Sequence, residues 1–174
     1  MLRDKVPEAN GVSSKPTTFV SRTELAYNSI SISRMHEHLK GGFSVVYKRV
    51  LVADDLAPVL SAVVALLQDS FDVVGMVSDG QAALEAILRL KPDLVVMDIA
   101  MPIMNGIEVA RELKVRVPKT KIVFFTVHKD SDIVATCLSA GAFGYVVKER
   151  MDSDLIPAMN EALAGRVFVS RISS

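Results

Sequence analysis

The fold is decided by the stretch Leu94-Val95-Val96-Met97-Asp98, in which four apolar residues run into a carboxylate. The same pattern occurs earlier, in Val50-Leu51-Val52-Ala53-Asp54-Asp55, and a later apolar run ends in a lysine, in Tyr145-Val146-Val147-Lys148. Short, continuous apolar runs are typical of strands that are buried on both faces, as in a parallel sheet. We therefore expect a parallel sheet whose strands carry charged residues at their carboxyl ends.

Strand and helix patterns alternate five times from Lys48 onward. The expected strands cover about 48–53, 71–77, 93–97, 120–126 and 144–147. Amphipathic helix patterns lie between and after them, at about 56–67, 83–88, 105–113, 131–140 and 153–164. Five such units predict an α/β fold in which helices cover both faces of a parallel sheet. The alternation alone leaves the strand order open.

The organisation of the 174 residues follows from composition. Residues 1–47 are rich in Ser and Thr and have no sustained periodicity, so we expect a mostly disordered N-terminal extension. Residues 48–166 form the expected domain, and residues 167–174 are a C-terminal tail. The single cysteine, Cys137, excludes an intrachain disulfide and lies in an apolar helical pattern, which favours a core position and a reducing compartment.

Charge and hydropathy narrow the classes of partner. Lys+Arg and Asp+Glu balance at 20 each, so no overall field points to nucleic acid or a membrane surface. The N-terminus has no apolar signal segment, and the longest apolar stretch, 56–67, is too short to span a bilayer. We therefore expect a cytoplasmic protein. One local basic cluster, interpreted as a helix end followed by a solvated loop, comprises Arg111, Lys114, Arg116, Lys119 and Lys121.

Chemically reactive side chains stand at the carboxyl ends of four expected strands. They are Asp54, Asp55, Asp98, Thr126 and Lys148. The carboxyl ends of parallel strands form the crevice in which open α/β sheets bind ligands. Crowded carboxylates repel one another and attract a divalent cation, and hard oxygen ligands suit Mg²⁺. A carboxylate can also attack phosphorus, provided that metal, ammonium and hydroxyl groups neutralise the phosphoryl oxygens.

Residues 48–166 resemble the receiver domain of two-component response regulators. One motif carries most of the resemblance, D-x-x-M-P-x-M-N-G in the stretch Asp98-Ile99-Ala100-Met101-Pro102-Ile103-Met104-Asn105-Gly106. It stands in register with the acidic pair 54–55, with Thr126, and with Gly141-Ala142-Phe143-Gly144-Tyr145-Val146-Val147-Lys148. The resemblance implies a flavodoxin-like (βα)5 doubly wound sheet with strand order 2-1-3-4-5.

The same resemblance implies the chemistry of the site. Asp98 would be the phosphoacceptor, receiving phosphate from the phosphohistidine of a sensor histidine kinase. Mg²⁺ would be bound directly by Asp55, Asp98 and the backbone carbonyl of Ala100, and by Asp54 mainly through a water. The chain would be no enzyme in the ordinary sense, because it would promote only its own phosphorylation and dephosphorylation.

The resemblance also implies a switch. Thr126 and Lys148 would hold the phosphoryl oxygens, and Tyr145 would be the aromatic residue that turns inward as Thr126 is drawn to the phosphate. The face formed by the fourth helix, fifth strand and fifth helix is then a candidate for homodimer formation. Glu149 stands where many receivers have a proline after a cis peptide, so we expect a trans peptide here.

The residues of segments 141–148 and 165–168 most resemble those of receivers of the NarL/LuxR type. Those usually continue into a helix-turn-helix DNA-binding domain, which this sequence does not contain, so direct nucleic-acid binding is not expected. The output would then pass through a missing or separate effector that controls transcription.

Three other functions are weighed against the phosphoacceptor. A phosphatase of the haloacid-dehalogenase kind needs a second Asp at the position that Ala100 occupies. A pseudo-receiver that acts only by protein contact would have lost acidic or lysine residues that are all present. A flavodoxin-like cofactor binder would need a glycine-rich phosphate loop, which is absent.

Overall fold

Six parallel strands form one sheet in the order β2-β1-β3-β4-β5-β6 within residues 46–172, the part of the chain that the computed structural model describes. The strands are β1 (Arg49–Ala53), β2 (Asp72–Val77), β3 (Leu94–Met97), β4 (Lys121–Thr126), β5 (Gly144–Val147) and β6 (Phe168–Val169). The expected order 2-1-3-4-5 is confirmed, and β6 extends the sheet beyond β5. Every residue of the central strand β3 is buried, because helices cover both faces of the sheet.

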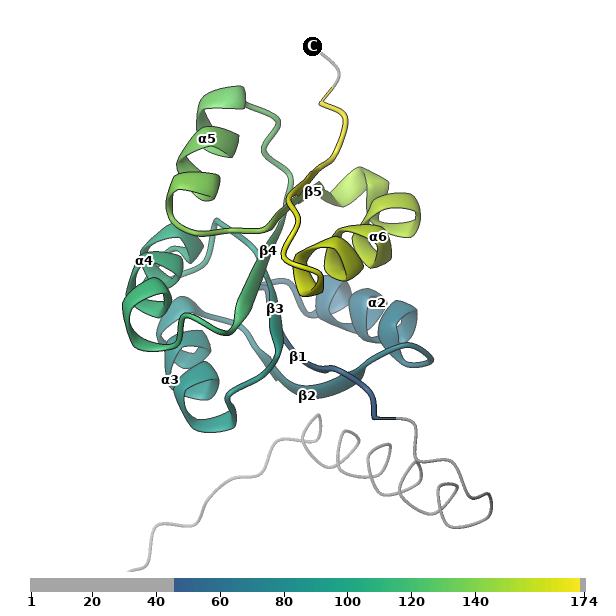
Figure 1. The fold of residues 1–174 in the computed structure, drawn as a ribbon, viewed down its shortest axis with the longest axis vertical. Helices are drawn as coiled ribbons and strands as arrows, with labels where there is room; N and C mark the ends of the chain where they lie inside the picture. The colour runs from purple at the N-terminus through teal and green to yellow at the C-terminus, as the bar shows by residue number, and fades with distance from the viewer. Residues whose placement is uncertain (1–45, 173–174) are drawn as a thin grey trace, which may run out of the picture. The chain divides into compact units, whose positions relative to one another are not determined.

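Five α-helices connect the strands and form two layers (Figure 1). They are α2 (Ala57–Leu67), α3 (Gly80–Leu90), α4 (Gly106–Arg116), α5 (Ser131–Ser139) and α6 (Met151–Leu163), with a short 3-10 turn, η2 (Lys148–Arg150), before α6. Helices α2 and α6 cover one face of the sheet, and α3, α4 and α5 cover the other (Figure 1). This flavodoxin-like arrangement is the expected one. Among the described helices, none combines the length and the apolar character needed to cross a bilayer.

The core lies between the sheet and its helices. Cys137 of α5 is fully buried, and burial raises the pKa of its thiol to about 12. The expectation that this cysteine is a core residue is therefore confirmed. The expected N-terminal extension, apart from Val46 and Tyr47, lies outside the described residues.

A capping box begins α4 and orders the segment after β3. The Asn105 side chain accepts a hydrogen bond from Glu108 N at 2.9 Å, and the Glu108 carboxylate accepts one from Asn105 N at 2.9 Å. Gly106 N also donates to Ile99 O at 2.9 Å, which closes the loop between β3 and α4. The residue after β3, Asp98, is thereby held between a strand end and an ordered loop.

The short strand β6 lies within the segment that the sequence analysis placed in the C-terminal tail. It pairs in parallel with β5 through hydrogen bonds from Phe168 N to Phe143 O (3.0 Å) and from Ser170 N to Tyr145 O (2.8 Å). A two-residue strand has no periodicity to detect, so only its neighbour β5 defines it.

A buried carboxylate ties β6 to helix α6. Asp154, 6% exposed, accepts hydrogen bonds from Arg150 Nε at 2.7 Å, from Ser153 Oγ at 2.6 Å and from Ser170 Oγ at 2.7 Å. The hydrogen bonds from Arg150, with those from the two serines, hold the pKa of Asp154 well below its usual value. A lowered pKa means that the charged form contributes to stability above the unfolded-state pKa, near 4.

Asp154→Asn is expected to lower the free energy of unfolding by about 2 kcal/mol at neutral pH, because charge-assisted hydrogen bonds of this kind contribute about 1.5–3 kcal/mol. The difference between wild type and variant should shrink at about pH 3, because the carboxylate of the unfolded state is protonated there while the native carboxylate is still charged. Chemical denaturation at both pH values measures it. An equal difference at both pH values would contradict the charged role of Asp154.

Candidate functional site

The reactive side chains that the sequence analysis singled out meet at the carboxyl edge of the sheet. Asp54 follows β1, Asp98 follows β3, Thr126 ends β4 and Lys148 follows β5. Asp54, Asp98 and Thr126 are buried, whereas Asp55 is exposed. The parallel register of the four strands brings these residues together from positions up to 94 residues apart in the chain (Asp54 to Lys148).

Lys148 pairs with both buried carboxylates. Its Nζ lies 2.6 Å from Asp54 Oδ2 and 2.8 Å from Asp98 Oδ2, and the Lys148 side chain is only 12% exposed. The other carboxylate oxygens accept backbone hydrogen bonds, Asp98 Oδ1 from Ile99 N at 2.6 Å and Asp54 Oδ1 from Leu56 N at 3.0 Å. One ammonium group thus offsets the repulsion between two carboxylates.

Burial and pairing act in opposite directions on the protonation of this cluster. Burial raises the pKa of Asp54 above its ordinary value, and the hydrogen bonds from Lys148 and Leu56 N only partly oppose it. Burial by itself would lower the pKa of Lys148, but hydrogen bonds to Asp54 and Asp98 outweigh it and raise that pKa. Lys148 therefore stays a cation at neutral pH.

The acidic residues fit a divalent cation. Asp54, Asp55 and Asp98 each offer one carboxylate oxygen, and these oxygens lie within 4.8 Å of one another. Asp55 is exposed, so the cluster opens to solvent on its side, and Ala100 lies in an exposed position two residues after Asp98. Hard oxygen donors that leave coordination positions for water are the set that Mg²⁺ takes in proteins.

Thr126 and Tyr145 are linked through the backbone of His128, a residue that the sequence analysis did not single out. The His128 amide donates a long hydrogen bond of 3.4 Å to Thr126 Oγ1, and the Tyr145 hydroxyl donates one of 3.0 Å to His128 O. Tyr145 is fully buried, and burial is the main cause that raises its pKa to about 12. Tyr145 is therefore in the inward position, and the backbone of one residue, His128, forms hydrogen bonds with both Thr126 and Tyr145. Backbone links of this kind have no sequence signature.

Glu149 connects two loops at the carboxyl edge. Its carboxylate lies 2.5 Å from Lys129 Nζ, and both side chains are largely exposed. The peptide between Lys148 and Glu149 is trans, as expected. The residue that replaces the family's proline thus ties the loop after β4 to the loop after β5.

A protein-family model described as the response regulator receiver domain matches residues 50–160. The nitrate/nitrite response regulator protein NarL of Escherichia coli strain K12 is 35% identical over 123 residues, which cover 70% of this chain and 57% of NarL. The transcriptional regulatory protein LnrK of Bacillus subtilis strain 168 is 33% identical over 119 residues, covering 67% of this chain and 54% of LnrK. The chain spans about half the length of the curated relatives it matches.

Solved structures agree with these relatives. A two-component response regulator of the LuxR family from Aurantimonas sp. SI85-9A1 superposes with a TM-score of 0.67 and 30% identity, covering 71% of this chain and 89% of that chain. The signal receiver domain of a response regulator named NarL from Mycobacterium tuberculosis gives a TM-score of 0.67 and 32% identity, covering 70% of this chain and 100% of that chain.

Proposed function

This chain belongs to the response regulator receiver family of two-component signalling, and we propose from this premise that it is a phosphoacceptor switch in which Asp98 is the phosphorylated residue. One observation supports the assignment above the others. The Asp98 carboxylate is nearly buried, is fixed through Ile99 N and the Lys148 ammonium, and lies beside two further carboxylates. A residue in this position is held in one orientation and has a charge-neutralising ammonium beside it, at the end of the central strand β3.

In the proposed reaction an Asp98 oxygen attacks the phosphorus of a phosphohistidine on a sensor histidine kinase. The phosphorus–nitrogen bond breaks, its electron pair stays on the imidazole, and an acyl phosphate forms on Asp98. Lys148, kept protonated by its raised pKa, neutralises a phosphoryl oxygen. Within the described residues, the Thr126 hydroxyl accepts a long hydrogen bond from His128 N and donates none, so its proton can be donated to another phosphoryl oxygen.

A Mg²⁺ ion bound here would neutralise the phosphoryl charge during transfer. Asp54, Asp55 and Asp98 would hold it with the backbone carbonyl of Ala100. This donor set supplies carboxylates and leaves room for water, in keeping with the small coordination shell of Mg²⁺. The chain would transform no separate substrate, since the phosphate is both received and lost at Asp98.

The proposed output is a change of the face formed by α5, β5 and α6. Added phosphate draws the Thr126 hydroxyl, Thr126 moves His128, and His128 changes the hydrogen bond to Tyr145. This face would serve a homodimer or a separate effector that controls transcription. We expect the encounter with the kinase to take place in the cytoplasm.

The test is incubation with acetyl phosphate and Mg²⁺, followed by intact-mass measurement. Wild type should gain the mass of one phosphoryl group, and Asp98→Asn should gain none. Asp69→Asn is the matched control, because Asp69 is an exposed carboxylate near the start of β2, at the opposite edge of the sheet. Chelation of Mg²⁺ should abolish the gain in wild type.

An adduct on Asp98→Asn equal to that on wild type would refute the assignment of Asp98. If wild type gained no phosphate from either acetyl phosphate or a histidine kinase, the result would favour a pseudo-receiver over a phosphoacceptor.

A further inference from the structure

The basic cluster on and after α4 is only partly explained by helix ends and solvent. Lys121 Nζ lies 3.8 Å from the centre of the Phe143 ring, Arg116 pairs with Glu112 at 3.1 Å, and Lys114 Nζ donates to the carbonyl of Ser139 at 3.2 Å. Within the described part of the chain, Arg111 has no hydrogen bond or ion pair. Arg111 also lies in the middle of α4, so the helix dipole does not account for it.

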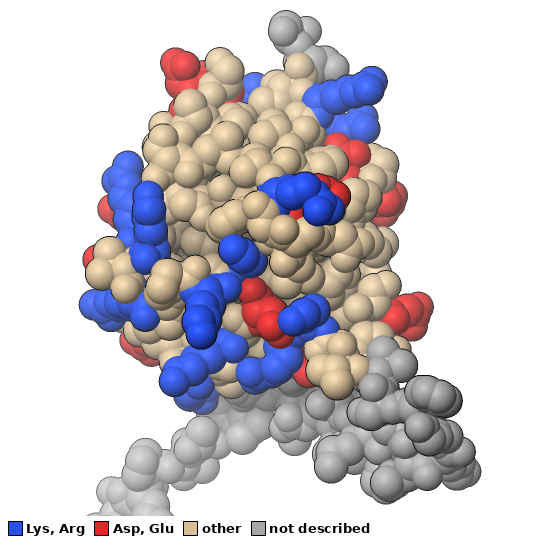
Figure 2. Space-filling model, viewed as in Figure 1, with Lys and Arg blue, Asp and Glu red and all other residues tan. Residues whose placement is uncertain are grey.

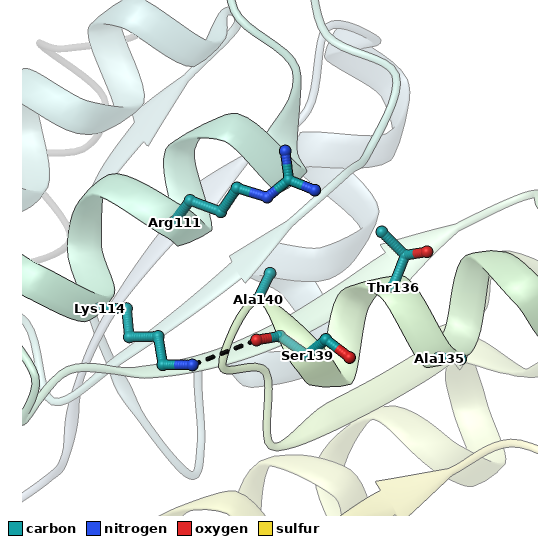
Figure 3. Close-up of a pocket in the computed structure, with 6 residues that line it drawn as sticks. All are labelled: Arg111, Lys114, Ala135, Thr136, Ser139 and Ala140. Carbon is teal, nitrogen blue, oxygen red and sulfur yellow. Dashed lines mark hydrogen bonds between the residues drawn. The ribbon is translucent and has the colours of Figure 1, made fainter.

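Arg111 and Lys114 line a cleft between α4 and α5. The cleft has a volume of about 370 Å³, and its other lining residues are Ala135, Thr136, Ser139 and Ala140 (Figure 3). Both cationic side chains extend from α4 toward the carboxyl-terminal half of α5 (Figure 3). No Asp or Glu is among the residues that line the cleft, so Arg111 and Lys114 give the lining a positive charge. Figure 2 shows basic side chains gathered on the side of the molecule where Figure 1 places α3 and α4.

A second cleft adjoins the first and shares Lys114 with it. Its volume is about 320 Å³, and its lining is mostly apolar, including Leu113, Val117, Ile122, Leu138, Phe143 and Val167. No carboxylate lines it either. Val115, one turn after Arg111, is 83% exposed. The two clefts meet at Lys114, and we call them together the α4–α5 groove, of which the first cleft is the cationic part and the second the apolar part.

The α4–α5 groove lies away from the acidic cluster. It is formed by the carboxyl-terminal halves of α4 and α5 and by residues at the starts of β4 and β5. Because the strands are parallel, their starts lie at the edge opposite to Asp98. A molecule in the groove would therefore leave the phosphoacceptor open.

We propose that the α4–α5 groove binds an acidic peptide segment of a partner protein, in which a carboxylate stands close to a large apolar residue. The Arg111 guanidinium matches a carboxylate in a two-pronged hydrogen bond, Lys114 adds a second charge, and the apolar residue enters the second cleft. The chain's own residues 1–45 suit the groove poorly, since they contain six Lys or Arg against four Asp or Glu. This binding is independent of phosphate on Asp98.

The test is selection of random peptides displayed on phage against the full chain, followed by affinity measurement on synthetic copies. Selected peptides should carry Asp or Glu beside Leu, Val or Phe. Arg111→Glu should weaken their binding by at least about tenfold. Arg89→Glu is the matched control, because Arg89 is an exposed arginine on α3 outside both clefts, and it should bind as wild type does.

Four results would overturn the inference. The first is selection of basic or uncharged peptides, and the second is equal binding of acidic peptides by wild type and Arg111→Glu. The third is self-association that Arg111→Glu abolishes, which would make a second copy of the chain the occupant. The fourth is binding of duplex DNA or phosphatidylserine vesicles that depends on Arg111 and displaces the peptides. Circular dichroism of each variant establishes that the fold is intact.

Discussion

Lys148→Met should lower the free energy of unfolding by about 3 kcal/mol in Mg²⁺-free buffer at neutral pH. The ammonium of Lys148 lies within 2.8 Å of both Asp54 and Asp98, whose side chains are 2% and 6% exposed. Removing one partner of a buried ion pair leaves charge without compensation, and this costs about 3–5 kcal/mol. Burial already raises the pKa of Asp54, so partial protonation keeps the loss near the lower end. Denaturant titration in the presence of EDTA measures it.

Millimolar Mg²⁺ should stabilise Lys148→Met more than wild type. In wild type the ammonium and a divalent cation compete for the same carboxylate oxygens, and in the variant only the cation remains. A ligand that binds the native state stabilises it according to its concentration relative to the dissociation constant, so tighter Mg²⁺ binding appears as a larger gain. Equal gains in both proteins would show that Lys148 does not oppose metal binding.

Lys129→Met is the control for removal of a positive charge at the carboxyl edge of the sheet. Lys129 also pairs with a carboxylate, that of Glu149, but the two side chains are 45% and 66% exposed. Exposed pairs contribute less than about 1 kcal/mol. Its unfolding free energy and Mg²⁺ response should therefore stay near those of wild type. If Lys148→Met were as stable as wild type in EDTA, Lys148 would not be neutralising the acidic cluster.

The sequence predicts the strands and helices well because the signal lies in local periodicity. Expected strand 93–97 and observed β3, Leu94–Met97, differ by one residue, since a buried parallel strand is a continuous apolar run. The capping box at Asn105 and Glu108 is equally local. Strand β6 is different, because its two residues are defined by hydrogen bonds to β5 rather than by their own pattern.

The features of the candidate site also divide into those that the sequence predicts and those that only the structure reveals. Strand-end positions predict that Asp54, Asp98 and Lys148 gather at one edge. That a single lysine bridges both carboxylates depends on side-chain conformations that have no sequence pattern. The connection from Thr126 to Tyr145 runs through a backbone unit at His128, where the identity of the residue carries no signal. The α4–α5 groove depends on how two helices pack, and the basic cluster alone pointed only to a helix end.

Gly106→Ala is the second substitution for which we expect a large loss of unfolding free energy, although Gly106 carries no reactive group. A Cβ at this position would lie 2.2 Å from the carbonyl oxygen of Asp98 and 3.1 Å from a ring carbon of Phe124. The clash is with backbone, so the start of α4 must move away from β3, and the hydrogen bond from Gly106 N to Ile99 O must lengthen. We expect a loss of about 3 kcal/mol in unfolding free energy, at the upper end for overpacking. Phosphorylation by acetyl phosphate should slow, because the carbonyl that must separate from α4 belongs to Asp98, the proposed phosphoacceptor.

Gly165→Ala separates this packing effect from a backbone effect. Gly165 has a φ of +77°, and a Cβ there would meet no atom within 4 Å. Its alanine variant should lose only about 1–2 kcal/mol through left-handed strain, with an unchanged phosphorylation rate. If Gly106→Ala phosphorylated as fast as Gly165→Ala, the close contact between α4 and Asp98 would have no part in the chemistry. If Gly106→Ala were phosphorylated slowly and Gly165→Ala at the normal rate, Asn105-Gly106 at the end of the D-x-x-M-P-x-M-N-G motif would be shown to position Asp98 at its start.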